Sequence, residues 1–339
     1  MITPRLWRRS LRAGGQFRLL ALWWASLLLP TLLAALPVLG FLGPLLDHST
    51  RAKQAVAWLD GATLIDLAKQ SGEPQGAALP AGHLAALLVL LAIAPAMAAA
   101  MVAAAGSDEP LRARELLGGA GRLFGRMGRM ALVSACVLGA AVLLAAGAFK
   151  LAANAGDRAV WATQAGRQFA GATAASAIAL WLAQLTLDAG RAVFAAQPSR
   201  RSAFLAWWAG VRLILRLPLR TIPVGLLGTV AGAGLAGAIM LARLRFEQRS
   251  AVRVAIAWAL AQAAVVAVGW GKATRIAGLA ELVRADSAER LRQPAFEMSP
   301  PVTIPAPPAA EPPPEGPGRP EALDVPLSPA LSPPDPSDT

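Results

Sequence analysis

The feature that most constrains this chain is a series of six apolar blocks, each long enough to cross a lipid bilayer. A transmembrane helix needs about 20 mostly apolar residues to span roughly 30 Å of hydrocarbon. Of the 339 residues, 55% are hydrophobic and 15% are charged, whereas soluble domains carry about 25% charged residues. We therefore predict an all-α integral membrane bundle of six transmembrane helices, with spans near 19–43, 83–105, 130–152, 169–190, 222–242 and 251–271.

The first block is too long to be a cleavable export signal. Arg8 and Arg9 precede it, as in a twin-arginine signal. The apolar run from Phe17 to Leu46 exceeds the roughly 7–15 residues of a signal-peptide core. We therefore expect a retained signal-anchor span.

Positive charge lies at the ends of the blocks and sets the expected orientation. Of the 32 Lys and Arg residues, 21 lie at the N-terminus, in the second and fourth connections and between the last span and residue 293, a segment that includes Lys272 and Arg275. The alternate connections hold 10. The positive-inside rule then places both termini in the cytoplasm of a bacterial inner membrane. A nucleic-acid-binding chain would gather its charge on a soluble face, so no nucleic-acid partner is expected.

A basic motif recurs about 90 residues apart and indicates an internal repeat. The stretch Arg122–Arg129 resembles Arg212–Arg220, and each leads directly into an apolar block. With a looser N-terminal version, this predicts three units, each a basic cytoplasmic interfacial helix followed by a transmembrane hairpin. The expected contacts to the anionic headgroups of the bilayer are Arg122, Arg126, Arg129, Arg212, Arg216 and Arg220.

Asp188 is the strongest candidate for an ionisable group within a span, where such groups are functional candidates. It lies three residues before Arg191, a spacing that puts both side chains on one helix face. This intramembrane polar pair either locks the bundle, which is the interpretation we favour, or acts as a coupling or gating pair.

In the fifth block, Gly228 and Gly232 predict close helix packing, within or between chains.

Patterns for catalysis or cofactor binding are missing from the sequence. Cys136 is the only cysteine, and His48 and His83 are the only histidines, too few for a metal site of the usual kind. No phosphate-binding loop or nucleophile elbow occurs either. We therefore predict no cofactor, no metal and no enzymatic activity.

The composition changes after about residue 293. Sixteen of the 27 prolines lie between Pro294 and Pro336, and hydrophobic periodicity stops. We predict a disordered, Pro-rich cytoplasmic tail over 294–339, separate from a transmembrane domain over 1–293. In the first extramembrane loop, Ala52–Gln70 predicts a short amphipathic helix.

The basic helices, together with Asp188-Ala-Gly-Arg191 at the end of a span, resemble uncharacterised families of six-span bacterial membrane proteins. Some of these are grouped with the membrane domain of glycerophosphodiester phosphodiesterases. The resemblance covers roughly residues 1–290 and implies the six-span organisation. It implies no activity, because the catalytic domain of those enzymes has no counterpart here.

Two hypotheses about function follow from the sequence. The first is a non-enzymatic membrane scaffold, assembly or regulatory component, acting with a membrane-protein partner or as a homo-oligomer. The alternative is a transporter or permease subunit in which Asp188 is a coupling residue. The internal repeat and the proline-broken spans favour the second hypothesis, and the basic surface and tail favour the first.

Overall fold

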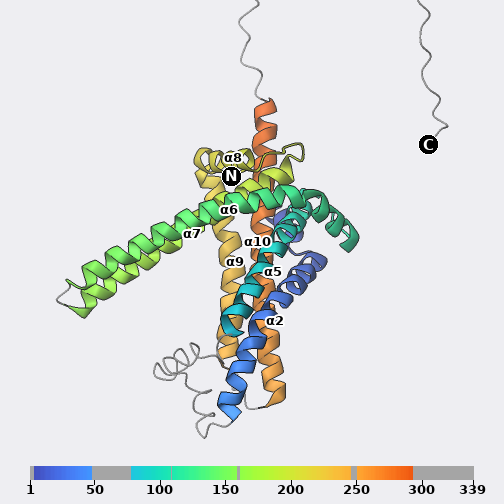
Figure 1. The fold of residues 1–339 in the computed structure, drawn as a ribbon. Coiled ribbons are helices and arrows are strands. Elements are labelled where there is room, and N and C mark those ends of the chain that lie inside the picture. Colours follow the sequence, from blue (N-terminus) through green and yellow to red (C-terminus); the bar gives the residue numbers. More distant parts are fainter. Residues whose placement is uncertain (1–3, 48–77, 108, 159–160, 246–249, 293–339) are drawn as a thin grey trace, which may run out of the picture. The chain divides into compact units, whose positions relative to one another are not determined.

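The computed structural model describes residues 4–47, 78–107, 109–158, 161–245 and 250–292. Within these ranges the chain is helical, without a β-strand (Figure 1). The elements are α1 (Pro4–Gly14), α2 (Phe17–Asp47), α5 (Ala78–Gly106), α6 (Ala113–Gly156), α7 (Ala162–Ala196), α8 (Ala203–Arg216), α9 (Pro218–Leu244) and α10 (Ala251–Arg292). The predicted helix over 52–70 and the tail over 294–339 lie outside the described residues.

Six of these helices are long and apolar enough to cross a membrane: α2, α5, α6, α7, α9 and α10. The predicted all-α bundle of six membrane-spanning helices is therefore confirmed. Two helices extend well past their predicted spans, because α6 has 44 residues and α10 has 42. At 1.5 Å per residue each is about 60 Å long, roughly twice the hydrocarbon thickness of a bilayer. Each is therefore longer than a span along the bilayer normal requires.

Local sequence signals explain where several helices begin. Before α6, the backbone N–H of Arg112 donates to the carboxylate of Glu115 at 2.6 Å, half of a capping box. The Ser202 hydroxyl caps α8 by accepting from the backbone N–H of Leu205 at 3.4 Å. Pro218 occupies the first position of α9, where its fixed φ suits a helix and its missing N–H costs nothing.

Consecutive spanning helices pack as hairpins, with α2 against α5, α6 against α7, and α9 against α10. The buried core lies where the end of α5, the end of α7 and the middle of α10 meet. Most of its buried hydrophobic residues lie within 99–105, 185–195 and 273–283. The short helices close this region, since α8 packs on α7 and α1 packs on α10.

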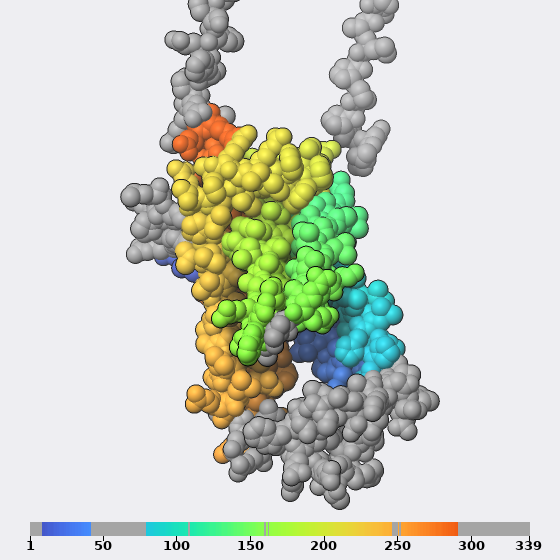
Figure 2. All heavy atoms as spheres, turned by 90° about the vertical axis from the view of Figure 1, so that its left-hand side faces the viewer, coloured from blue at the N-terminus to red at the C-terminus, as the bar shows by residue number. Residues whose placement is uncertain are grey.

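The loop end of the α6–α7 hairpin is covered far less than the rest. In Figure 1 it diverges from α2, α5, α9 and α10, and in Figure 2 its surface (green) faces the viewer. Among the described residues of 135–158 and 161–180, here called the outer hairpin, the buried ones are Ala141, Ala152, Ala172 and Ser176. Leu143 is 74% exposed and Leu151 is 71% exposed. In a membrane these side chains face lipid or another protein.

Candidate functional site

Asp188 lies at the centre of a buried ionic cluster. Its side chain is fully buried near the end of α7. One carboxylate oxygen accepts from Arg191 Nη1 at 2.5 Å, one helical turn further along α7. The other oxygen accepts from Arg275 Nη2, which belongs to α10. Asp188 therefore joins two helices that are far apart in the sequence.

Each guanidinium also binds a hydroxyl on a further helix. Arg191 Nη2 donates to Ser134 Oγ of α6 at 3.2 Å. Arg275 Nη1 donates to Thr229 Oγ1 of α9 at 2.8 Å, and Trp181 Nε1 donates to the same hydroxyl at 3.1 Å. A single hydrogen-bonded network thus connects α6, α7, α9 and α10.

The cluster holds more positive than negative charge. Arg191 and Arg275 have side chains only 11% and 10% exposed, yet they share one carboxylate. Lys272 lies one turn before Arg275 on α10, with its ammonium 5.7 Å from the ring centre of Trp23. Taking charges out of water is costly, so removing one partner of a buried pair leaves a charge whose desolvation nothing offsets. The carboxylate of Asp188 is therefore the group on which the cluster depends.

Glycines let α9 approach α10 closely beside this cluster. A Cβ placed on Gly232 would lie 2.7 Å from the Cα of Gly271, and one on Gly228 would lie 2.9 Å from the Cβ of Arg275. Contacts this close do not accommodate a methyl group, so the backbones touch only because both residues are glycine. The structure places Gly228 and Gly232 in a contact within the chain, against Gly271.

A second glycine contact seats α8 on α7 immediately beside Asp188. A Cβ on Gly210 would lie 2.8 Å from the carbonyl carbon of Ala189, and one on Gly190 would lie 2.8 Å from the Cα of Trp207. The helix that carries Arg212 and Arg216 is thereby held against the end of the span that carries Asp188.

The six arginines expected at the headgroups lie on three helices. Three lie on α6, where Arg126 donates to the carbonyl of Pro198 at 2.6 Å and Arg129 donates to Gly125 within its own helix. The basic stretch that includes them is the first part of the continuous helix α6, not a separate helix. Arg212 and Arg216 lie on α8, and Arg220, at the start of α9, approaches Glu289 at 3.9 Å.

Arg275 and Lys272 are the site residues that the sequence reasoning missed. The sequence pattern assigns both to the cytoplasmic segment after the last span, whereas the structure places them inside the continuous helix α10. A signal was present, because the apolar run Ile276–Ala280 resumes directly after Arg275. That run indicates a longer helix with an embedded cation. Thr229 and Ser134, which serve the cluster as hydroxyl partners, carry no comparable signal.

The remaining candidates for a polar site are the two histidines and the glutamine of the last span. His83 contacts the carbonyl of Leu79 at 2.6 Å, and His48 lies outside the described residues. Gln262 accepts from Trp24 Nε1 at 2.9 Å, which links α10 to α2. Within the described ranges no three His, Cys, Asp or Glu side chains gather as metal ligands.

No protein family, curated protein or solved structure matches this chain.

Proposed function

We propose that this chain is a non-enzymatic scaffold, assembly or regulatory component of a membrane, and that it recruits a partner through the outer hairpin. The partner is a transmembrane helix of another protein or of a second copy of this chain. We further propose that the membrane is a bacterial inner membrane, that both termini are cytoplasmic and that three repeated units build the bundle. The distribution of Lys and Arg supports this orientation.

One stripe of α6 carries this proposal. Gly139, Leu143, Gly147 and Leu151 follow one another at intervals of four residues, which places them on one helix face. All four are exposed. A Cβ on either glycine would meet nothing within 4 Å. Alternating small and large residues allow a second transmembrane helix to pack closely.

The remainder of the bundle supports the same interpretation by contrast. Gly228, Gly232 and Gly271 are used to pack α9 on α10. Asp188 is fully engaged by its two arginines. A rigid, closed core combined with an uncovered glycine-containing face suits a protein whose task is to hold another.

A photo-crosslinking amino acid at Leu143 tests the proposal. In membranes it should yield a defined protein adduct, either with a partner or of twice the chain's own mass. The matched control is Leu36 of α2, which is 61% exposed and should yield lipid adducts alone. Gly147→Leu, one turn away, should abolish the adduct from position 143. Lipid adducts alone from both positions would reject the proposal.

The alternative is a transporter or permease subunit in which Asp188 couples an ion to a solute. The observation in its favour is an ionisable cluster within membrane-spanning helices. Reconstituted vesicles containing the dye pyranine test it, because proton movement across the membrane changes the dye's fluorescence. Proton flux that is present in the wild type and lost in a correctly inserted Asp188→Asn variant would favour this alternative over the scaffold.

A further inference from the structure

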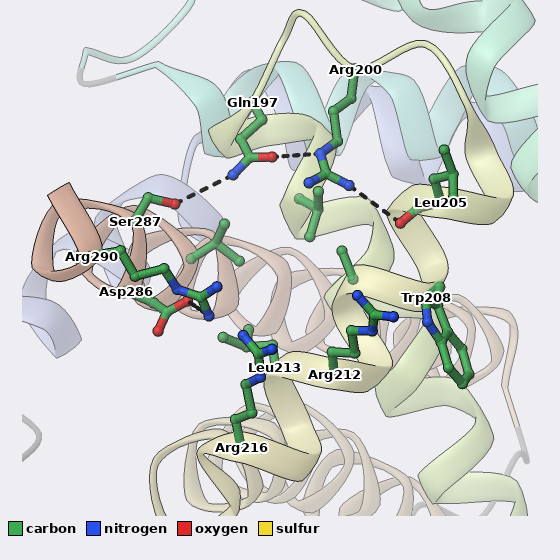
Figure 3. A pocket seen from close by; sticks show the side chains of 13 residues that line it. Gln197, Arg200, Leu205, Trp208, Arg212, Leu213, Arg216, Asp286, Ser287 and Arg290 are labelled. Carbon is green, nitrogen blue, oxygen red and sulfur yellow. Dashed lines mark hydrogen bonds and ion pairs between the residues drawn. The ribbon is translucent and has the colours of Figure 1, made fainter. Parts of the chain in front are cut away.

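A basic cleft lies between the end of α7, helix α8 and the last turns of α10. Its volume is about 510 Å³, and four arginines line it, namely Arg200, Arg212, Arg216 and Arg290. Figure 3 shows their guanidinium groups directed into a common space. We call this feature the arginine cleft.

Helical spacing explains why these side chains converge. Trp208, Arg212 and Arg216 follow at intervals of four residues and so form one face of α8. Asp286 and Arg290 do the same on α10. Arg200 comes from the connection after α7, where its Nε donates to Gln197 Oε1 at 2.6 Å and its Nη1 donates to the carbonyl of Leu205 at 3.4 Å.

The positive charge of the cleft is only partly neutralised. Asp286 is its single carboxylate, and it pairs with Arg290 at 2.6 Å. Arg212 lies over the ring of Trp208, 5.6 Å from the centroid. Within the described part of the chain, neither Arg212 nor Arg216 has a carboxylate partner. Four cations and one anion leave a formal charge of +3, so an anion is the complementary ligand.

The floor of the cleft is apolar, which distinguishes it from a site for a small soluble anion. Val193, Leu213 and Val283 lie beneath the arginines and are almost fully buried. Exposed apolar side chains flank the arginines on α8, because Phe204, one turn before Trp208, is 57% exposed and Leu215, beside Arg216, is 73% exposed. A helix of this kind lies at the membrane surface, with its apolar side chains among the acyl chains. An amphiphilic anion would therefore reach the cleft from the bilayer.

We propose that the arginine cleft is a binding site for the phosphate group of an anionic phospholipid. Guanidinium groups bind phosphate through paired, charge-assisted hydrogen bonds. Basic pockets between helices on the cytoplasmic side are suited to such headgroups. The inference rests on the membrane location and orientation proposed above. It does not depend on the partner of the outer hairpin, so either proposal can fail alone.

Native mass spectrometry of the purified full-length chain, offered equal amounts of phosphatidylglycerol and phosphatidylcholine, tests the site. The wild type should retain one phosphatidylglycerol. The double variant Arg212→Gln and Arg216→Gln should retain it about a hundredfold less, because each of the two removed contacts to phosphate contributes about tenfold. Phosphatidylcholine retention should stay low in both proteins.

The matched control removes two arginines from elsewhere on the surface. Arg114→Gln on α6 and Arg167→Gln on α7 produce the same change in net charge at exposed residues outside the cleft, and phosphatidylglycerol retention should be unchanged. Equal losses from the two double variants would mean diffuse surface attraction and would overturn the proposal. Full retention by the cleft variant would overturn it as well.

Two further experiments test whether binding depends on guanidinium geometry or on net charge alone, and whether the ligand is a lipid or free phosphate. Arg212→Lys with Arg216→Lys keeps the charge but loses the planar donors, so retention should fall to an intermediate level. This variant also serves if the Gln variant fails to fold, and unchanged retention would then count against the site. An excess of inorganic phosphate should leave the lipid bound. Displacement of the lipid by phosphate alone would show that the ligand is the soluble anion and overturn the assignment to a phospholipid.

Discussion

Asp188→Asn is the substitution that most directly tests how this bundle is held together. Asn has nearly the same volume as Asp, so the change removes the charge and leaves the packing. Arg191 and Arg275 would then be two buried cations without a counter-ion, each having lost a charge-assisted hydrogen bond. Breaking a buried ion pair from one side costs about 3–5 kcal/mol. We expect a loss of unfolding free energy in that range.

The excess of cations predicts an unusual order of effects. Arg275→Met removes one cation but leaves Asp188 paired with Arg191 at 2.5 Å, so it should destabilise less than Asp188→Asn does. The double variant Asp188→Asn with Arg275→Met should be more stable than Asp188→Asn alone, because one fewer unpaired cation then remains buried.

Reversible unfolding in mixed micelles, followed by helical circular dichroism, gives the free energies that this cycle requires. The control is Asp286→Asn on α10, where the pair with Arg290 has side chains 23% and 52% exposed. Exposed pairs contribute about 0–1 kcal/mol, so the control should hardly shift the transition. If Asp188→Asn proves as mild as the control, or if the double variant is less stable than Asp188→Asn, the electrostatic account of the cluster is wrong.

The remaining predictions concern helix packing and topology. Gly271→Ala would place a Cβ 2.6 Å from the Cα of Gly232 and should lower stability by about 1–3 kcal/mol in the same unfolding assay. Gly237→Ala on the same helix pair meets open space and should stabilise by up to about 1 kcal/mol, because Ala favours the helix. In a Cys136→Ser background, Ala310→Cys should react with a membrane-impermeant maleimide only after the membrane has been permeabilised and the reagent can reach the cytoplasm. Labelling of intact cells from outside would reverse the proposed orientation.

The helical spans could be predicted because crossing hydrocarbon leaves a direct trace in the sequence. Long apolar blocks are required at every span, and each predicted block is found inside one helix of the structure. The ends of the helices were harder to predict from the sequence. Hydropathy does not mark where α6 begins or where α10 ends, because the helix continues beyond the apolar part.

The polar site could be predicted only where its members are neighbours in the sequence. Asp188 and Arg191 are three residues apart, so helical geometry alone brings them together. Arg275 lies 87 positions from Asp188, and its contact depends on how α10 packs against α7. The arginine cleft is a similar case. The spacing of Arg212 and Arg216 was visible, whereas Arg200 and Arg290 join them only through tertiary packing.

The unbroken course of α10 has a consequence for how the two charged regions affect one another. Arg275 and Arg290 lie 15 residues, or about 22 Å, apart on one continuous helix. A phospholipid bound in the arginine cleft would hold the end of α10 against α8. It would therefore also restrict rotation and translation of α10 at Arg275, beside Asp188. Such linkage is reciprocal, so a loosened ion cluster should weaken lipid retention as well. We expect the bundle to be more rigid in a leaflet rich in anionic lipid, which would make the bilayer's composition a determinant of how firmly this protein holds its own helices.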